Sequence, residues 1–237
     1  MGRIWITGDK HGTLVPLFGL AEKIMLKNTD ILLIAGDAGY VWDKHYCDTV
    51  ATLQQIFPGT IAFVDGNHEN HQLLNSFAVS QWQGGRVHQI GERVYHLLRG
   101  ELYTIYGMVF FTFGGARSVD KDRREAGKSW WQEEEPTEKE IEYGRKQMDC
   151  HVNEIDYVIT HECPLFARAF LSRKKEIAPD YRLPHCLEQW YHIVSNGKRF
   201  QKWYFGHMHT DQLITPKLRG VHHDILPLGE EAPILWR

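Results

Sequence analysis

Residues 30–37 read Asp30-Ile31-Leu32-Leu33-Ile34-Ala35-Gly36-Asp37, and this stretch decides the fold class. The nearly continuous apolar run from Ile31 to Ala35 is typical of a strand that is covered on both faces. Two similar runs, residues 3–7 and 60–64, flank it in the sequence, and stretches with helical spacing of apolar residues separate the three. This β-α-β-α-β order predicts a parallel sheet that presents ligand groups at the carboxyl ends of its strands.

The second half of the chain follows a different rhythm. Short β-type runs between residues 86 and 113 are separated by Gly100 and Gly107, which predicts hairpins and a meander. The elements expected after them are a polar helix, two buried strands and a set of short strands, over residues 136–151, 157–160, 203–205 and 212–236.

Composition excludes several classes of function. The formal net charge of -3 and a pI near 6.5 argue against a protein that grips long duplex nucleic acid through bulk charge. No apolar run reaches the ~18–20 residues of a membrane span, and the four cysteines form no close pair. Met1 leads straight into a strand, without a signal peptide. We therefore expect a cytoplasmic protein with small buried cysteines, folded as one domain over residues 1–237.

Five short blocks of metal-binding residue types are spread along the chain, and most of them close a strand-like run. Carboxylates, imidazoles and an amide oxygen are the ligands that two neighbouring divalent metals need. One such dipeptide would mean little, whereas five in this order are hard to obtain by accident. The candidate ligands are Asp9, His11, Asp37, Asn67, His161, His207 and His209, with His68 as one imidazole beyond them.

The chemistry of these side chains suggests their roles. Asp9 and His11 lie two residues apart past a strand end, so a loop can turn both toward one point. The Asp37 carboxylate is suited to bridge two cations, and the Asn67 amide supplies an oxygen without adding charge. His68 has no metal left to bind and lies beside a ligand, where it is placed to donate a proton to a leaving group. Two metals about 3.5–4 Å apart would clamp a phosphoryl group and generate hydroxide for in-line attack.

The chain resembles the calcineurin-like metallophosphoesterases in five blocks, namely Gly8-Asp9-Lys10-His11-Gly12, Gly36-Asp37, Gly66-Asn67-His68-Glu69, His161 and Gly206-His207-Met208-His209. The resemblance implies an α/β (α+β) fold, a two-sheet β-sandwich flanked by helices in four αββα layers. It also implies two sets of ligands: Asp9, His11 and His209 for one metal, and Asn67, His161 and His207 for the other. Asp37 would bridge the metals, and His68 would be the catalytic histidine. The two transition-metal ions would be Mn, Fe, Zn or Ni.

A distinctive loop insertion, residues 114–135, follows the expected strand that ends at Phe113. We expect this loop to face the substrate. Its cations could bind phosphate and its tryptophans could stack on a base; these residues are Arg117, Lys121, Arg123, Arg124, Trp130 and Trp131. The alternative is that the charges form a solvated face and the tryptophans pack the loop onto the body.

The favoured function is a metal-dependent phosphoesterase that hydrolyses a phosphomonoester or phosphodiester, with a nucleotide or a short nucleic acid as the substrate. A serine/threonine-type protein phosphatase is the first alternative, favoured by Glu69. It is disfavoured because residues 38–42 supply neither the arginine nor the second acid of that branch. A non-catalytic binding scaffold is the second alternative, and such a protein would be expected to lose ligands or His68.

Histidines outside the blocks receive weaker assignments. For His222 and His223, near the end of the chain, a surface role is the favoured interpretation and a place beside the metal site is the alternative. His71 follows the Asn67-His68 block closely, and contact with a ligand is an option for it.

Overall fold

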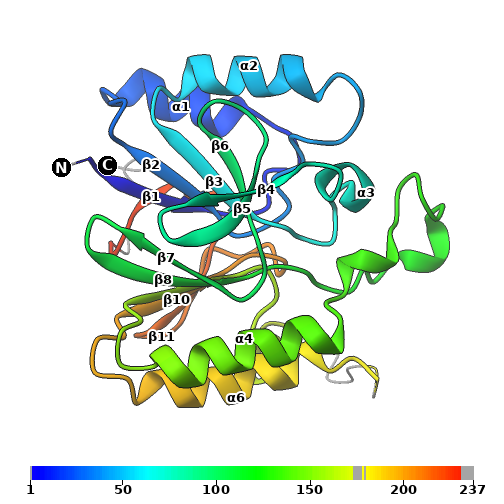
Figure 1. Ribbon diagram of the computed structural model, residues 1–237, viewed down its shortest axis with the longest axis vertical. Coiled ribbons are helices and arrows are strands. Elements are labelled where there is room, and N and C mark those ends of the chain that lie inside the picture. The colour runs from blue at the N-terminus through cyan, green and yellow to red at the C-terminus, as the bar shows by residue number, and fades with distance from the viewer. Residues whose placement is uncertain (1, 173–177, 179, 231–237) are drawn as a thin grey trace.

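The computed structural model describes residues 2–172, 178 and 180–230. Two β-sheets face each other at its centre, and helices cover the outer face of each sheet (Figure 1). The expected two-sheet sandwich with four αββα layers is therefore confirmed.

The first sheet contains the predicted parallel strands. Its order is β13-β1-β2-β3-β6-β5-β4, in which β1, β2, β3 and β6 are parallel neighbours and the remaining strands pair antiparallel. The bounds are β1 Ile4–Thr7, β2 Ile31–Ile34, β3 Thr60–Val64, β4 Val79–Trp82, β5 Gly85–Gln89, β6 Val94–Leu97 and β13 Leu226–Pro227.

The second sheet has the same general plan. Its order is β11-β12-β10-β9-β8-β7, with β8, β9, β10 and β12 parallel and the two edge strands antiparallel. The bounds are β7 Glu101–Ile105, β8 Met108–Phe113, β9 Tyr157–Thr160, β10 Lys202–Phe205, β11 Leu213–Thr215 and β12 Leu218–Gly220.

Two groups of helices form the outer layers (Figure 1). Residues of α1 (Val15–Lys23) and α2 (Tyr46–Ile56) pack on the first sheet. Residues of α4 (Glu138–His151), α5 (Leu165–Leu171) and α6 (Leu183–Ser195) pack on the second sheet. A single turn, α3 (His71–Leu74), follows β3, and two 3-10 turns, Lys121–Arg123 and Gln132–Glu134, lie in the loop 114–135.

Burial on both faces explains why the central strands are continuously apolar. Ile4 and Ile6 pack between the sheets, whereas Trp5 points the other way, toward α1 and α2. In β8, Phe110 lies between the sheets and Phe111 faces the helices of the second sheet.

The predicted meander at residues 86–113 is only partly correct. The hairpin at Gly107 is confirmed, because Tyr106 and Gly107 both adopt positive φ between β7 and β8. The hairpin at Gly100 is wrong. There the chain leaves the first sheet, where β6 pairs parallel with β3, and enters the second. Hydrophobic alternation does not reveal which sheet a strand joins, so this crossing could not be predicted from the sequence.

Two other expectations have definite outcomes. Within the part of the chain that the structure describes, no helix is both long and apolar enough to cross a bilayer. All four cysteines are unpaired, but Cys47 and Cys150 are exposed and only Cys163 is fully buried. The prediction of buried cysteines is therefore wrong for two of them. The last of the predicted C-terminal strand region, residues 231–236, lies outside the described residues.

Candidate metal centre

The candidate ligands gather where parallel strands of both sheets end. The first sheet contributes residues that follow β1, β2 and β3, and the second contributes residues that follow β9 and β10. In chain order these are Asp9 and His11, then Asp37, then Asn67 and His68, then His161, then His207 and His209. The carboxyl ends of the strands therefore deliver the predicted groups to one place, as expected for parallel sheets.

Glycines before the candidate ligands allow a close approach between these loops. A Cβ atom on Gly36 would lie 2.2 Å from Nδ1 of His161, and one on Gly66 would lie 2.0 Å from Oδ1 of Asp37. Neither distance is possible for a real side chain. The Gly-Asp and Gly-Asn pairs are thus needed for the loops to meet.

The backbone is strained at the same place. Among described non-glycine residues, seven have positive φ, and five of these are candidate ligands: Asp9 at 50°, His11 at 46°, Asp37 at 48°, His207 at 60° and His209 at 45°. Such conformations cost energy for residues with a Cβ and cluster at functional sites. The surrounding structure therefore holds these residues in a strained backbone conformation, as is common where side chains have a functional role.

Asp37 lies between two groups of side chains. Its Oδ2 is 3.8 Å from Nε2 of His11, and its Oδ1 is 3.4 Å from Nε2 of His161. The His68 backbone N–H donates to Oδ1 at 2.7 Å and fixes the carboxylate. The two oxygens of one carboxylate therefore face two different imidazoles, which is the arrangement that a bridging ligand needs.

The spacing within each group suits a shared ion. Nε2 of His11 lies 3.3 Å from Nε2 of His209, and Nε2 of His161 lies 3.0 Å from Oδ1 of Asn67. Two donors that are each about 2.1 Å from one ion lie roughly 3.0–3.4 Å apart. Both pairs of donor atoms fall within this range.

Two buried carboxylate oxygens give an independent test of whether metals fit. Asp9 Oδ2 and Asp37 Oδ2 are buried and accept no hydrogen bond from any described residue. Burial alone would raise the pKa of Asp9, but His222 and His161 more than offset it, so this pKa lies below its ordinary value. An ionised, buried oxygen without a donor is costly unless a cation binds it. The donor set therefore fits divalent metals.

Neighbouring groups orient the candidate imidazoles. Nδ1 of His161 donates to the Ala35 carbonyl at 2.9 Å, which leaves its Nε2 free for the centre. Nε2 of His207 lies 3.6 Å from the buried Glu162, whose carboxylate is held by Tyr181 and Arg168 at 2.6 Å each. Such outer contacts fix ring orientation in metal sites.

Glu69, the last residue of its block, supports the turn after Asp37. Its buried carboxylate accepts from the backbone N–H groups of Ala38 at 2.7 Å and Gly39 at 3.3 Å. Burial raises its pKa well above the ordinary value, and the charge of Asp37 adds to this effect. Glu69 thus holds the backbone of the loop that follows Asp37.

His68 is half-buried beside the centre. Its ring meets that of His11 edge-on, with 5.3 Å between centroids, and its Nε2 is 3.5 Å from Nη2 of Arg124. Burial lowers the pKa of His68 to about 4, although Asp37 opposes the shift. Arg124 itself is anchored by Asp120 at 2.8 Å.

The loop 114–135 brings some predicted substrate residues to the site and engages others elsewhere. Arg124 reaches His68, whereas Arg117 pairs with Glu135 at 2.8 Å and Asp180 at 3.1 Å. Of the other predicted residues, Lys121 and Arg123 are exposed, and Nζ of Lys121 lies 4.4 Å from the centroid of the Trp130 ring.

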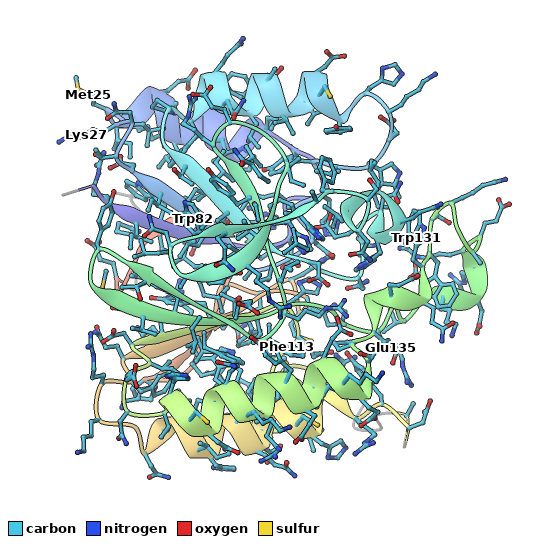
Figure 2. The ribbon with its side chains drawn as sticks, viewed as in Figure 1. Met25, Lys27, Trp82, Phe113, Trp131 and Glu135 are labelled. Atoms are coloured by element: carbon cyan, nitrogen blue, oxygen red, sulfur yellow. The ribbon has the colours of Figure 1, made fainter. Side chains whose placement is uncertain are left out.

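Trp131 packs the loop onto the body, as the alternative interpretation of the tryptophans expects. It is 6% exposed and meets Trp42 edge-on, with 5.6 Å between ring centroids. Figure 2 shows Trp131 where the projecting loop meets the body, and Glu135 where the loop returns toward α4. One tryptophan of the pair therefore fastens the loop.

Three residues at the centre were not among the predicted site residues. Nδ2 of Asn67 donates to Oγ of Ser118 at 3.1 Å, and Ser118 donates from both N and Oγ to the buried Glu134 at 2.7 Å. Nδ1 of His222 lies 3.7 Å from Oδ2 of Asp9, so the favoured surface interpretation of His222 is wrong. His223 is exposed, as expected. No motif marks Ser118, Glu134 or His222, because their roles depend on loop contacts across the fold.

A second buried group of histidines lies beside the centre. We call it the Asp65 cluster; its members are Asp65, His88, His96 and Arg99. The four residues line a cavity of about 540 Å³ together with His71, and none of the seven candidate ligands lines that cavity. His71 is buried with Nε2 3.1 Å from the Gly66 carbonyl, so it contacts the backbone next to Asn67.

The family model for calcineurin-like phosphoesterases matches residues 2–211. The chain belongs to the calcineurin-like phosphoesterase family. Membership of this family supports metal-dependent hydrolysis of phosphate esters, and the structure contains candidate ligand groups for metals. The family resemblance drawn from the five blocks is confirmed.

Comparisons with individual proteins add little to the family assignment. No curated protein matches the chain. Among solved structures, this calcineurin-like phosphoesterase is similar to the sulfate thiohydrolase SoxB of Thermus thermophilus in complex with glycerol, with 11% identity and a TM-score of 0.40. The match covers 88% of this chain and 37% of that one.

Proposed function

We propose that this chain is a dinuclear phosphoesterase acting on a nucleotide or a short nucleic acid. Asp9, His11 and His209 hold one metal, and a second set of three, Asn67, His161 and His207, holds the other. Asp37 would bridge the two. The observation that carries the proposal is the Asp37 carboxylate, whose two oxygens face His11 and His161 separately.

The residues around the metals divide the work of hydrolysis. When bound, two divalent ions supply Lewis acidity to the phosphoryl oxygens and to the attacking water. His68 lies beside the centre. The charge of a bound phosphate ester would raise its pKa from about 4, and the protonated ring would donate a proton to the leaving oxygen. Arg124, 3.5 Å from His68, offers its guanidinium to a phosphate oxygen that points away from the ligands. Mn, Fe, Zn and Ni all suit the donor set.

The substrate class rests on the loop and on charge. The chain forms one domain over residues 1–237, and its loop 114–135 faces the substrate. The protein is cytoplasmic. Arg124 supplies the nearest loop cation, while Trp130 with Lys121 above it supplies an aromatic face for a base. A net charge of -3 favours a short ligand over a long duplex. Arg117 and Arg123 contribute less, because Arg117 is already paired with two acids.

A metal-dependence assay tests the reaction. The protein is stripped of metal, reloaded with Mn, Zn or Ni, and assayed on p-nitrophenyl phosphate and bis-p-nitrophenyl phosphate beside Asp37→Asn. We expect turnover that needs metal and is lost in Asp37→Asn, with the preferred ester separating monoesterase from diesterase. Absence of turnover with any metal, despite two bound ions per chain, would favour the scaffold alternative.

The substrate proposal needs its own comparison. Arg124→Ala and Trp130→Ala are assayed on nucleoside phosphates, short oligonucleotides and a phosphoserine peptide, with Arg123→Ala as the exposed matched control. We expect the first two variants to raise KM for nucleotides and Arg123→Ala to change it less than twofold. If Arg124→Ala and Trp130→Ala both left nucleotide turnover unchanged while the peptide remained the best substrate, the protein phosphatase alternative would replace the proposal.

A further inference from the structure

We propose that His222 is an additional ligand of the metal held by Asp9, His11 and His209. The inference rests on the proposed dinuclear centre and adds an imidazole that the five sequence blocks do not contain. Residue 222 also lies beyond residues 2–211, the part of the chain that the family model matches.

The first observation is a pair of buried atoms that face each other without a hydrogen bond. Nδ1 of His222 and Oδ2 of Asp9 lie 3.7 Å apart, and neither has a hydrogen-bond partner in the described part of the chain. A carboxylate and an imidazole that served only each other would close to about 2.7–3.0 Å. The two atoms are therefore not a closed hydrogen-bonded pair, and their separation of 3.7 Å lies close to the roughly 3.0–3.4 Å between two donors on one ion.

The second observation is that this separation matches those between the other candidate ligands. His11 lies 3.3 Å from His209 and 3.8 Å from Asp37, measured between donor atoms. Asp9, His209 and His222 offer donor atoms that all lie within 4.8 Å of one another. The rings of His209 and His222 are nearly parallel, with 4.5 Å between centroids and 5° between planes. His222 is thus placed as a member of the set.

The third observation is that the backbone around His222 is anchored to the site. The carboxylate of Asp211, two residues after His209, accepts the N–H groups of His222 at 2.8 Å, His223 at 3.0 Å and Asp224 at 3.2 Å. On the other side, Nζ of Lys10, between Asp9 and His11, donates to the His222 carbonyl. The turn is therefore held from both neighbouring blocks, which sets the ring beside Asp9.

A fifth protein ligand, beyond Asp9, His11, His209 and the bridging Asp37, would change the chemistry expected of this position. With His11, His209 and His222, the Asp9 position would carry three imidazoles in addition to the bridging carboxylate. Imidazole favours Zn, Fe, Ni and Co over the harder ions that prefer oxygen ligands. The two metal positions would then differ in affinity, with the Asp9 position the tighter one for these metals.

Metal binding by the whole chain tests the proposal without substrate. Metal-free wild type, His222→Ala, His222→Phe and the matched control His223→Ala are titrated with Co²⁺, followed by visible absorption and equilibrium dialysis. The phenylalanine variant keeps a ring stacked on His209 but offers no donor atom. Circular dichroism of the metal-free proteins checks that all four are folded.

We expect two Co²⁺ per wild-type chain, with one of the two affinities at least about tenfold weaker in both His222 variants. The visible spectrum of that site should change in both variants, and added imidazole should restore it in His222→Ala. His223→Ala should match the wild type. A spectrum that stays unchanged in both His222 variants, or equal losses in His223→Ala, would overturn the ligand assignment.

Failure of the underlying centre looks different. If the wild type bound fewer than two Co²⁺ per chain, the dinuclear centre itself would be wrong, and this inference would fall with it. If the wild type bound two and the His222 variants bound them equally well, only the role of His222 would be withdrawn.

Discussion

The chain contains two adjacent buried groups of histidine and aspartate, and they differ in whether their carboxylates are satisfied. In the Asp65 cluster, Arg99 and His96 both contact the Asp65 carboxylate, and His96 contacts His88 at 3.1 Å. In the metal centre, Asp9 and Asp37 each keep one buried oxygen without a donor. Residue type and burial are alike in the two groups. The carboxylate oxygens without a donor distinguish the metal centre, which fits metal ions, from the Asp65 cluster, which is an ion-pair network complete in itself.

Backbone conformation separates the two groups in the same way. His88 and His96 are paired residues on neighbouring regular strands, β5 and β6. Asp9, Asp37 and His209 stand in loops with positive φ. Sheet packing alone accounts for the first pair. Asp9, Asp37 and His209 are held in a backbone conformation that non-glycine residues disfavour, as is common at functional sites.

The largest expected effect contrasts the same substitution in the two groups. Asp37→Asn should lower phosphoester hydrolysis on the order of 10³-fold or more, because the bridging carboxylate serves both metals. Metal content, measured by mass spectrometry of the dialysed protein, should fall below two per chain. Asp65→Asn is the matched control and should keep both metals. Equal metal loss in the two variants would break the comparison.

A second substitution separates binding from turnover within the metal centre. His68→Ala should bind two metals yet lose about 10²–10⁴-fold in turnover, the usual range for removal of a proton donor. Steady-state rates and metal content are measured on the same preparation. Hydrolysis of a phosphodiester at the wild-type rate would remove His68 from the reaction.

The free energy of unfolding tests the role of the Asp65 cluster in the comparison. Asp65→Asn should lower the free energy of unfolding by about 3 kcal/mol, since it leaves the buried Arg99 without its main counter-charge. Urea unfolding of the metal-free protein at pH 7 measures this loss. An effect below about 1 kcal/mol would mean that Glu140, 3.3 Å from Arg99, suffices as a partner.

The stabilising effect of Asp65 should also depend on pH. Burial alone would raise the pKa of Asp65, but Arg99 and His96 more than offset it and hold this pKa far below its ordinary value. Its contribution is therefore full above the unfolded pKa of about 4 and is lost as the pH falls below it. The difference in unfolding free energy between wild type and Asp65→Asn should shrink from pH 7 to pH 3. A difference independent of pH would contradict the depressed pKa.

The smallest expected effect concerns His88. Burial, with the charge of His96, lowers the pKa of His88 to about 4, below the unfolded value of about 6.5. Its neutral form is favoured in the fold, so stability should fall as the pH drops from about 6.5 toward 4. His88→Gln should cost about 1 kcal/mol at pH 7 and weaken this decline. Metal content should not change. A midpoint near 6.5 for His88 in an NMR titration would contradict the shift.

The first half of the fold could be predicted from sequence because its signals are local. Apolar runs marked β1, β2 and β3 to within about a residue, and the residue types that follow them marked the candidate ligands. The crossing from β6 in the first sheet to β7 in the second was not predictable, since the same alternation suits either sheet. His222 was missed for a similar reason: it reaches Asp9 from 213 positions away through a turn that Asp211 holds. The pairing of Arg117 with Asp180 likewise depends on tertiary contact.

The hydrogen bonds from Asn67 to Ser118 and from Ser118 to Glu134 make the two ends of the loop part of the wall of the metal centre. Between Ser118 and the packed Trp131, residues 119–130 include most of the exposed loop residues. The loop therefore has fixed attachment points and an exchangeable middle. A grafted stretch of another length or charge could replace that middle while Ser118 and Glu134 stay. Such grafts offer a route to new specificities on an unchanged hydrolytic centre, in the laboratory as in evolution.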